Sequence, residues 1–409
     1  MKRILGVALG ILTAIGGFVD IGDLVTNAVV GSRFGLSLLW VVVLGVIGIC
    51  AFAHMSGKVA VVSGRATFEI IRERLGSRAA GANLGASFLI NLMTVTAEVG
   101  GIALALQLAS SVNYLLWIPL AALAVWLVIW RVKFKILENV TGLMGLSLII
   151  FGVALFALGP DWTELADQAL TPAIPGNEGP AVYFYYAVAL FGAAMTPYEV
   201  FFFSSGAVEE GWKLKDLMQS RINVLVGFPL GGLLSVAIAA CAAVVLLPAG
   251  IQVTSLSQVV LPVAEAGGKL FLAIAIIGVV AATFGAALET TLSSGYTLAQ
   301  FFGWSWGKFH RPANAARFHL SMILTLLIGL AVLATGVDPV LVTEYSVVFS
   351  AIALPLTYIP VLIVANDPEY MGEHVNGRGL NLLGTFYLGI ILVASLSAIP
   401  LMIVTGAGA

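Results

Sequence analysis

The sequence contains little charge for its length. Only 10% of its 409 residues are Asp, Glu, Lys or Arg, whereas 60% are hydrophobic, and the formal net charge is −2. Soluble domains carry about 25% charged residues, and a folded globule of this length needs more polar surface than this composition supplies. The scarcity of charge excludes a soluble enzyme and a disordered chain, and the lack of excess positive charge argues against nucleic acid as a partner. The composition predicts a polytopic integral membrane protein in a lipid bilayer.

Cysteine and histidine are also scarce, with two and four residues. Cys50 and Cys241 lie in apolar runs, so we interpret them as small buried side chains and not as a disulfide or a redox pair. The sequence lacks the zinc motif H-E-x-x-H and the phosphate-binding motif G-x-x-x-x-G-K-[ST]. We therefore predict that the protein is not an enzyme, has no resident cofactor and is not driven by a nucleotide.

What the sequence has in abundance is long apolar runs. A bilayer core requires about 20 residues of helix, and these runs are continuous, which favours helices over a transmembrane β-barrel. The connecting loops are short, so we expect one all-α transmembrane domain over residues 1–409. Eleven spans are predicted, over residues 4–32, 37–62, 80–110, 114–130, 139–159, 181–206, 222–247, 268–300, 318–336, 340–365 and 380–405.

The distribution of basic residues predicts the orientation. With a cytoplasmic N-terminus, 17 of the 19 Lys and Arg residues lie on the cytoplasmic side, all except Arg33 and Lys269. The positive-inside rule then places the C-terminus outside. Residues 64–76 are charged and amphipathic, which predicts a cytoplasmic interfacial helix. The external loop at about 160–180 carries acidic residues and no Lys or Arg. It is interpreted either as a solvated loop or as a vestibule that attracts cations.

Acidic residues lie inside the predicted spans, whereas the basic residues lie at or beyond span ends. An ionisable side chain within a membrane is unfavourable and therefore indicates function. An unpaired carboxylate there must be protonated or meet a cation, so the excess of acids favours a path for cations over a site for an anionic substrate. These acids are Asp20, Asp23, Glu98, Glu199, Glu289 and, near the start of a span, Glu344.

Two spans are predicted to be interrupted in mid-membrane. Span 1 contains GGFVDIGDLVTN, with Gly16, Gly17 and Gly22 around its two acids. Span 6 contains GAAMTPYEVFF, in which Pro197 removes a helical hydrogen bond. Span 6 follows span 1 by five spans, and interrupted helices at matching positions of two halves indicate a transporter built from inverted repeats. Carbonyls freed at such breaks coordinate cations.

The segment FVDIGDLVTNAVVGSRFGLSLLWVVVLG resembles the first two spans of the Nramp divalent-metal transporters, whose span-1 hallmark D-P-G-N corresponds to residues 20–23. Similar resemblance is found in VSGRATFEIIRERLG, in TAEVGGIALAL and in LPLTYIPVLIVANDPEYMG, and it covers nearly the whole chain. The resemblance implies the LeuT-type fold with broken helices 1 and 6. Spans 1–5 (residues 1–159) and 6–10 (residues 181–365) are then inverted repeats, and residues 380–405 form an additional span.

The chain departs from the family pattern at positions that bear on the metal. The hallmark Asn is Asp23, and the family's span-6 motif A-x-M-P-H reads AMTPY, with Thr196 in place of the metal-binding Met and Tyr198 in place of His. Val95 replaces an acid three residues before Glu98. This pattern resembles the Nramp-related magnesium transporters, a divergent branch that carries Mg²⁺ and Mn²⁺ without proton coupling.

Coordination chemistry favours the same ion. A thioether is a soft ligand that selects transition metals, so a hydroxyl in its place removes that selection. Replacing Asn by Asp adds a negatively charged oxygen. The result is an acid-rich site with oxygen ligands only, which suits Mg²⁺ and leaves room for an ion that keeps several of its waters.

The candidate metal-contacting residues surround the two breaks. Asp20 and Asp23 are the strongest ligand candidates, and Asp23 has the alternative role of a hydrogen-bonding brace. Thr196 contacts the ion through its hydroxyl or its carbonyl, and Ala193 through its carbonyl. The remaining candidates are Tyr198, Glu199 as a ligand support or exit-path acid, and Glu98 as a lining or proton-holding acid, whereas Asn27 is interpreted as a brace and Glu289 and Glu344 as pathway or structural acids.

Three alternatives remain beside an uncoupled, monomeric transporter of Mg²⁺ and Mn²⁺. The first is a proton-coupled importer of Mn²⁺ and Fe²⁺, which the missing Met, His and span-3 acid disfavour. The second is an amino-acid transporter of the same fold, which requires a neutral or basic site for the substrate carboxylate. The third is a membrane enzyme, for which we find no motif.

Overall fold

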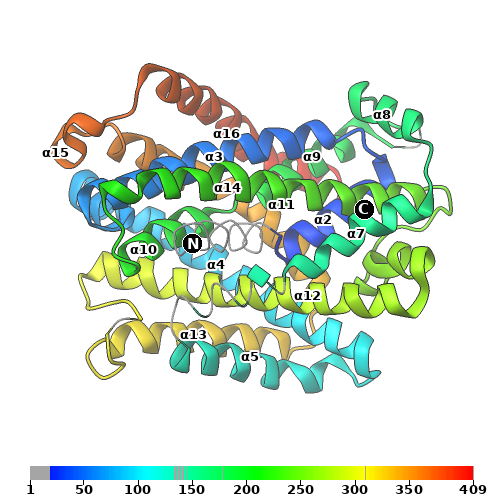
Figure 1. Cartoon of the computed structure of the whole chain (residues 1–409), viewed down its shortest axis with the longest axis horizontal. Helices are drawn as coiled ribbons and strands as arrows, with labels where there is room; N and C mark the ends of the chain where they lie inside the picture. The colour runs from blue at the N-terminus through cyan, green and yellow to red at the C-terminus, as the bar shows by residue number, and fades with distance from the viewer. Residues whose placement is uncertain are drawn as a thin grey trace.

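The structure is a computed structural model that describes residues 19–132, 136, 140, 142–143, 145–176, 178–308 and 310–408. Within these ranges every regular element is a helix, and no strand occurs, so the predicted all-α class is confirmed (Figure 1). The elements are α2 (Ile21–Phe34), α3 (Leu39–Ser63), α4 (Thr67–Ser110), α5 (Tyr114–Arg131), η1 (Leu146–Leu148), α7 (Ile149–Leu158), α8 (Trp162–Leu170), α9 (Pro180–Ala194), α10 (Pro197–Glu209), η2 (Leu214–Asp216), α11 (Leu217–Val245), α12 (Leu256–Phe302), α13 (Ala316–Leu333), α14 (Pro339–Val364), α15 (Pro368–Met371), η3 (Gly372–His374) and α16 (Arg378–Val404).

Nine helical segments of the described ranges are long and apolar enough to cross a bilayer, with α9 and α10 counted together. They correspond to all of the predicted spans except the first and the fifth. For the first span, α2 supplies the second half, and the first half, with Gly16 and Gly17, lies outside the described residues. For the fifth span, the described part is η1 and α7, and the chain then bends by 119° into α8.

Glycine residues bend the two longest helices. In α4, Gly76 has φ 80° and ψ 168°, so residues 67–75 turn away from the long membrane-spanning part. In this first segment Phe68 and Ile71 are buried, whereas Arg72 and Arg74 are exposed, which is the amphipathic pattern predicted for residues 64–76. In α12 the bend falls at residues 267–268, where the predicted span begins. The helical segment 256–266 that precedes this bend was not predicted.

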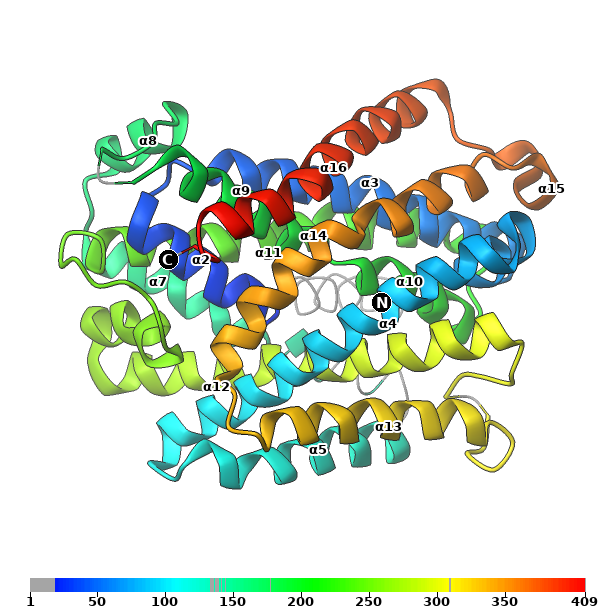
Figure 2. The ribbon, with the colours of Figure 1, turned by 180° about the vertical axis from the view of Figure 1, so that it is seen from behind.

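The breaks are held inside the bundle by close helix packing. α4 packs against both α12 and α14 in the interior, α5 and α13 lie together on one side, and α16 lies on the opposite side (Figures 1 and 2). A Cβ atom at Gly31 of α2 would lie 2.1 Å from the carbonyl oxygen of Ala239 in α11. One at Gly192 of α9 would lie 2.2 Å from the carbonyl oxygen of Val347 in α14. Small residues thus let both interrupted helices approach their neighbours.

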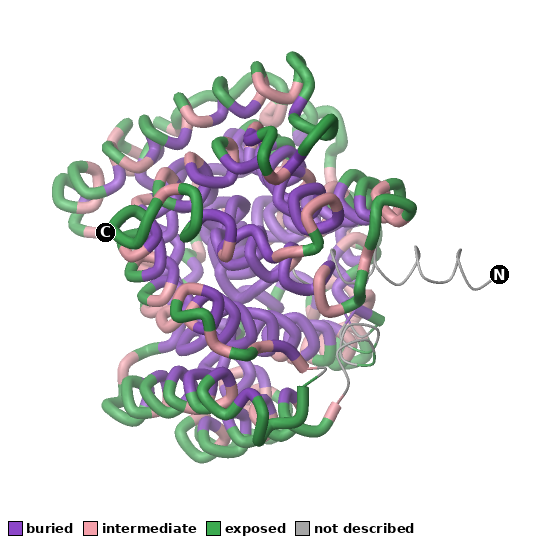
Figure 3. The backbone as a smooth tube through the Cα atoms, turned by 90° about the vertical axis from the view of Figure 1, so that its left-hand side faces the viewer, coloured by how far each residue is buried: buried purple, intermediate pink, exposed green. Residues whose placement is uncertain are grey.

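The outer surface is apolar where a bilayer would surround it. Buried residues fill the interior of the bundle, and exposed residues follow its outer helices (Figure 3). On α16, Leu382, Val393 and Leu396 are 69% to 75% exposed. Such a face is stable against lipid rather than water. Cys50 and Cys241 are buried and free, as predicted.

Candidate metal site

The first break lies directly before α2. Asp20 has an extended backbone and caps this helix, because its Oδ1 accepts a hydrogen bond of 2.8 Å from the backbone N–H of Asp23. Glu98 of α4 accepts one of 3.0 Å from the N–H of Ile21 through Oε1. Two carboxylates therefore meet at the amino end of α2, whose dipole favours negative charge. Asp20 and Glu98 are 3% and 0% exposed.

The second break separates α9 from α10. α9 ends at Ala194 and α10 begins at Pro197, so Met195 and Thr196 have non-helical backbone. Because proline has no N–H, the carbonyl of Ala193 lacks its usual donor four residues on. The carbonyl of Met195 accepts a hydrogen bond of 3.1 Å from the hydroxyl of Tyr358, and Thr196 makes no capping bond with its side chain. This break therefore presents neutral oxygens at the negative end of a helix dipole.

Tyr198 connects the two breaks. Its hydroxyl donates a hydrogen bond of 3.3 Å to Oδ2 of Asp20, and its carbonyl accepts one of 3.3 Å from the hydroxyl of Ser293 in α12. Asp20, Thr196 and Tyr198 are all buried. The residue that replaces the family's His thus lies against the predicted main ligand as a neutral donor.

Asp23 faces a different neighbour. Its Oδ1 accepts a hydrogen bond of 2.8 Å from Nδ2 of Asn27, and its Oδ2 accepts one from the hydroxyl of Ser235 in α11. Asn27 also donates to the carbonyl of Asp23 at 2.9 Å, which is the bracing role predicted for it. In this conformation the carboxylate of Asp23 braces α2 against α11. Its place in the ligand set stays a prediction, since a carboxylate has further lone pairs for an ion.

Four acids surround Tyr198 within the range of electrostatic interaction. They are Asp20, Glu98, Glu199 and Glu289. Oε1 of Glu199 and Oε2 of Glu98 are buried and accept no hydrogen bond from a described residue. Glu289, on α12, joins this group only through the tertiary structure. Glu344 of α14 lies instead within electrostatic range of Arg33 and Tyr186.

The described residues contain no group of three or more His, Cys, Asp or Glu side chains close enough to hold a metal ion together. The candidate site is therefore not a preformed cage of charged ligands. The carboxylate of Asp20 lies beside the hydroxyl of Tyr198, in the first turn after the second break, whose carbonyls and Thr196 hydroxyl are neutral oxygen donors. Such a donor set fits an ion that keeps part of its water shell.

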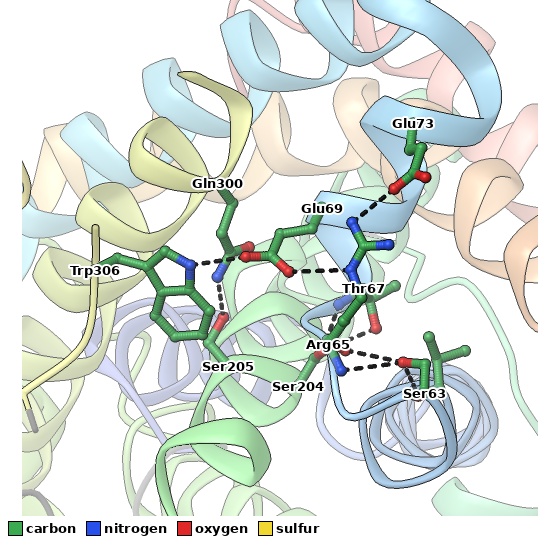
Figure 4. A network of polar contacts seen from close by, with 10 residues as sticks. Ser63, Arg65, Thr67, Glu69, Glu73, Ser204, Ser205, Gln300 and Trp306 are labelled. Atoms are coloured by element: carbon green, nitrogen blue, oxygen red, sulfur yellow. Dashed lines mark hydrogen bonds and ion pairs between the residues drawn. The ribbon is translucent and has the colours of Figure 1, made fainter. Parts of the chain in front are cut away.

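A polar network lies near the bend of α4 (Figure 4). Arg65 pairs with Glu73 at 2.6 Å and lies 3.7 Å from Glu69, and the indole N–H of Trp306 donates to Glu69 at 2.8 Å. Gln300 of α12 donates to the hydroxyl of Ser205 in α10 at 2.9 Å. The backbone N–H of Thr67 in α4 donates to the hydroxyl of Ser204 in α10 at 2.8 Å, so the network links α4, α10 and α12. Beside it lies a cavity of about 500 Å³ lined by Arg65, Glu69, Arg72, Glu73, Ser77, Gln300 and Gly303.

A second network lies at the carboxyl end of α2. Arg33 forms a bidentate pair with Glu178, with N···O distances of 2.7 and 3.0 Å. It also donates to the hydroxyl of Tyr186 in α9 at 3.1 Å and to the carbonyl of Gly408 at 2.7 Å. One of the acids of the predicted external loop is thus used in a structural ion pair.

Comparison with known proteins identifies the family. Residues 10–400 match the family model for Nramp, which is described as natural resistance-associated macrophage protein-like. The chain belongs to the Nramp family. Members of this family are membrane transporters, so the prediction that the chain is not an enzyme is confirmed.

Curated members of the Nramp family align along most of this chain. A divalent metal cation transporter MntH of Pectobacterium carotovorum subsp. carotovorum is 27% identical over 389 residues, which cover 93% of this chain and 90% of that protein. One of Aeromonas hydrophila subsp. hydrophila is 26% identical, with coverage of 92% and 91%.

Solved structures show the same fold. A crystal structure of a manganese transporter mutant of Eremococcus coleocola matches with a TM-score of 0.79 at 18% identity, covering 96% of this chain and 85% of that one. Mhp1, a nucleobase-cation-symport-1 family transporter in a closed conformation, matches with a TM-score of 0.63 at 16% identity, covering 96% and 91%. The predicted LeuT-type fold of an Nramp protein is therefore confirmed, and the choice of metal is a separate question.

Three residues that hold the breaks in place were not predicted from the sequence. Ser235, Ser293 and Tyr358 contribute the hydroxyls that hold Asp23, Tyr198 and Met195. Serine and tyrosine are common in helices that pack in membranes, so none of these three stands out in the sequence. Each lies within a predicted span, and the sequence carries no further signal for its role.

Proposed function

We propose that this Nramp protein takes up divalent metal cations, Mg²⁺ and Mn²⁺, by alternating access and without proton coupling. The two MntH relatives are named as divalent metal cation transporters, and the structural neighbour is a manganese transporter. The observation that carries the proposal is the pairing of the Asp20 carboxylate with a second break whose Thr196 hydroxyl and backbone carbonyls are oxygen donors, whereas the sulfur of Met195 lies against Gly48 of α3.

The proposed ligand set is the one predicted from sequence. Asp20 supplies the charge, Thr196 and Ala193 supply neutral oxygens, and Asp23 turns toward the ion when it is released from Ser235. Tyr198, Glu98 and Glu199 surround the ion at longer range, where their contacts pass through water. An ion of this kind is held through its hydration shell, which Mg²⁺ gives up reluctantly.

The proposed absence of proton coupling rests on the groups at the break. Tyr198 replaces the family's His, and a tyrosine hydroxyl is neutral near pH 7. Val95, which replaces the span-3 acid, is fully buried and has no ionisable group. Glu98 is the residue that could still carry a proton, and a proton-coupled Mn²⁺/Fe²⁺ importer fits the family equally well.

Alternating access requires the two ends of the path to open in turn. We infer that the network of Figure 4 closes the cytoplasmic end and that the Arg33 network closes the external end. This orientation rests on the positive-inside rule, with the N-terminus inside and the C-terminus outside. The two repeats, over residues 1–159 and 181–365, would tilt against each other, with residues 380–405 as the additional span of a monomer.

Ion uptake into proteoliposomes tests the function directly. Mg²⁺, Mn²⁺, Ca²⁺ and an amino acid are compared, and the internal pH is recorded with a trapped dye. We expect saturable uptake of Mg²⁺ and Mn²⁺ at constant internal pH. Metal-dependent acidification that Glu98→Gln abolishes would support the proton-coupled importer instead, and uptake of the amino acid alone would refute metal transport.

A further inference from the structure

A buried lysine near the end of α3 has no acidic partner among the residues that the structure describes. Lys58 is 6% exposed, and its Nζ donates to Oδ1 of Asn376 at 2.6 Å. Within the described part of the chain, neither Lys58 nor Arg221 takes part in an ion pair with an acid. A buried ammonium that faces only an amide is unfavourable unless another negative group neutralises it.

Two further basic side chains lie beside this lysine. His54 precedes Lys58 by one helical turn and so lies on the same face of α3. One turn earlier, Cys50 contacts the carbonyl of Val224 in α11 at 3.5 Å. Further along α3, a Cβ at Gly57 would lie 3.0 Å from the hydroxyl of Ser220. The contact on α11 thus moves back from Val224 to Ser220 as α3 advances from Cys50 to Gly57, so the two helices run antiparallel here. Arg221 is therefore beside His54, and its charge acts on both His54 and Lys58.

Two further hydrogen-bonding atoms of these residues are unused. Nδ2 of Asn376 and Nδ1 of His54 are buried and have no partner among the described residues. Asn376 is itself 6% exposed, although residues 372–375 before it and 377–379 after it are exposed. A buried amide N–H group without an acceptor is uncommon. Lys58, His54, Arg221 and Asn376, named here the basic corner, thus present an ammonium, a guanidinium and unpartnered polar groups together.

We propose that the basic corner binds a phosphate group. A phosphate oxygen would accept from Nζ of Lys58 and Nδ2 of Asn376, and the exposed guanidinium of Arg221 would complete the charge balance at the outer edge. The place favours the headgroup of an anionic phospholipid as the source, because Lys58 lies five residues before the end of a membrane-spanning helix. Soluble inorganic phosphate has the same chemistry and is distinguished by the test.

The test measures thermal unfolding of the full-length protein in a neutral detergent with a metal chelator. Short-chain phosphatidylglycerol, short-chain phosphatidylcholine and inorganic phosphate are titrated separately. We expect phosphatidylglycerol to raise the melting temperature saturably, and Lys58→Met to raise its half-saturating concentration about tenfold, the scale of one charge-assisted hydrogen bond. The control is Lys215→Met, an exposed lysine six residues before Arg221, which should leave the titration unchanged.

Arg221→Gln provides a second variant if Lys58→Met does not fold, because Arg221 is exposed and its replacement leaves the packing intact. It should weaken the phosphatidylglycerol effect several-fold. A Lys58-dependent shift with inorganic phosphate at similar concentrations would support the site and assign it to a soluble anion. Titrations that are flat for the unmodified protein, or equal for Lys58→Met and Lys215→Met, would overturn the proposal.

Discussion

The two breaks in the helices are built from opposite kinds of group. The break before α2 is charged, with Asp20 and Glu98 both accepting hydrogen bonds at the amino end of that helix. The break between α9 and α10 is neutral, with Thr196 and the carbonyls around Pro197. This difference indicates separate tasks, in which the first break supplies attraction for a cation and the second supplies discrimination between cations. The predictions below test that division, from the largest expected effect to the smallest.

Removing the charge at the first break should abolish transport. We expect no uptake of Mg²⁺ or Mn²⁺ into proteoliposomes by Asp20→Ala, because a cation then loses the carboxylate that contacts the second break through Tyr198. Loss of the helix cap costs about 1 kcal/mol, which the fold should tolerate. Asp20→Asn keeps an acceptor for the N–H of Asp23 and should be equally inactive.

Asp161→Asn is the matched control for this variant. Asp161 also caps a helix, α8, but it is exposed. Full uptake by Asp161→Asn beside none by Asp20→Asn would assign the loss to the charge at the break. Normal Mg²⁺ uptake by Asp20→Ala would remove Asp20 from the site.

Changing the second break should alter selectivity rather than abolish binding. Thr196→Met introduces a soft thioether and narrows the space for a hydrated ion. Isothermal titration with Mg²⁺, Mn²⁺ and Cd²⁺ should show weaker Mg²⁺ binding and a relative affinity shifted toward Cd²⁺ by about tenfold, or ~1.4 kcal/mol. Thr171→Met, in an exposed loop, is the control. An unchanged affinity ratio would mean that discrimination does not reside at this break.

Glu98, at the first break, should stabilise the start of α2 and should not carry a transported proton. Glu98→Gln keeps an oxygen that accepts from the N–H of Ile21, so we expect uptake to fall less than tenfold, at the scale of a weakened hydrogen bond. The pH dependence of uptake should not change. Glu98→Ala removes the acceptor and should lower uptake further. A loss of pH dependence in Glu98→Gln would assign it a proton.

The contact between the breaks should contribute least among the site residues. Tyr198→Phe removes a hydroxyl that is 3.3 Å from Asp20, and a bond of this kind contributes about 0.5–1.5 kcal/mol. Uptake should therefore decrease several-fold at most, measured at subsaturating Mg²⁺. Complete inactivity of Tyr198→Phe would mean that the two breaks act as one unit, against the division argued above.

The ion pair between Arg65 and Glu73, which belongs to neither break, gives the smallest expected change in stability. Glu73→Gln breaks the ion pair with Arg65, whose side chains are 51% and 43% exposed, and exposed pairs of this kind contribute about 0–1 kcal/mol. Thermal unfolding should change by no more than that amount. A large loss of stability would show that the network of Figure 4 carries more of the fold than its exposure indicates.

The sequence predicted the second break well and the first one in part. Pro197 predicts a break directly, because proline has no backbone N–H in any surroundings. In the structure α10 begins at that residue. The acids at residues 20 and 23 suggested one shared site, yet their carboxylates point toward different helices, α10 and α11. Helical spacing alone does not fix which neighbour a side chain meets, because that depends on how the helices cross.

What the sequence alone determined was the class, the spans and the chemical inventory, because hydropathy and the missing charges act locally along the chain. Only the tertiary structure decided that Glu289 joins Asp20 and Glu98 around Tyr198, that Ser235 holds Asp23, and that Lys58 lies in a corner without an acid. The physical reason is that such pairings join residues far apart in the chain, 212 positions for Asp23 and Ser235 and 318 for Lys58 and Asn376. The electrostatic interactions between these side chains become strong only when helix packing removes the water between them.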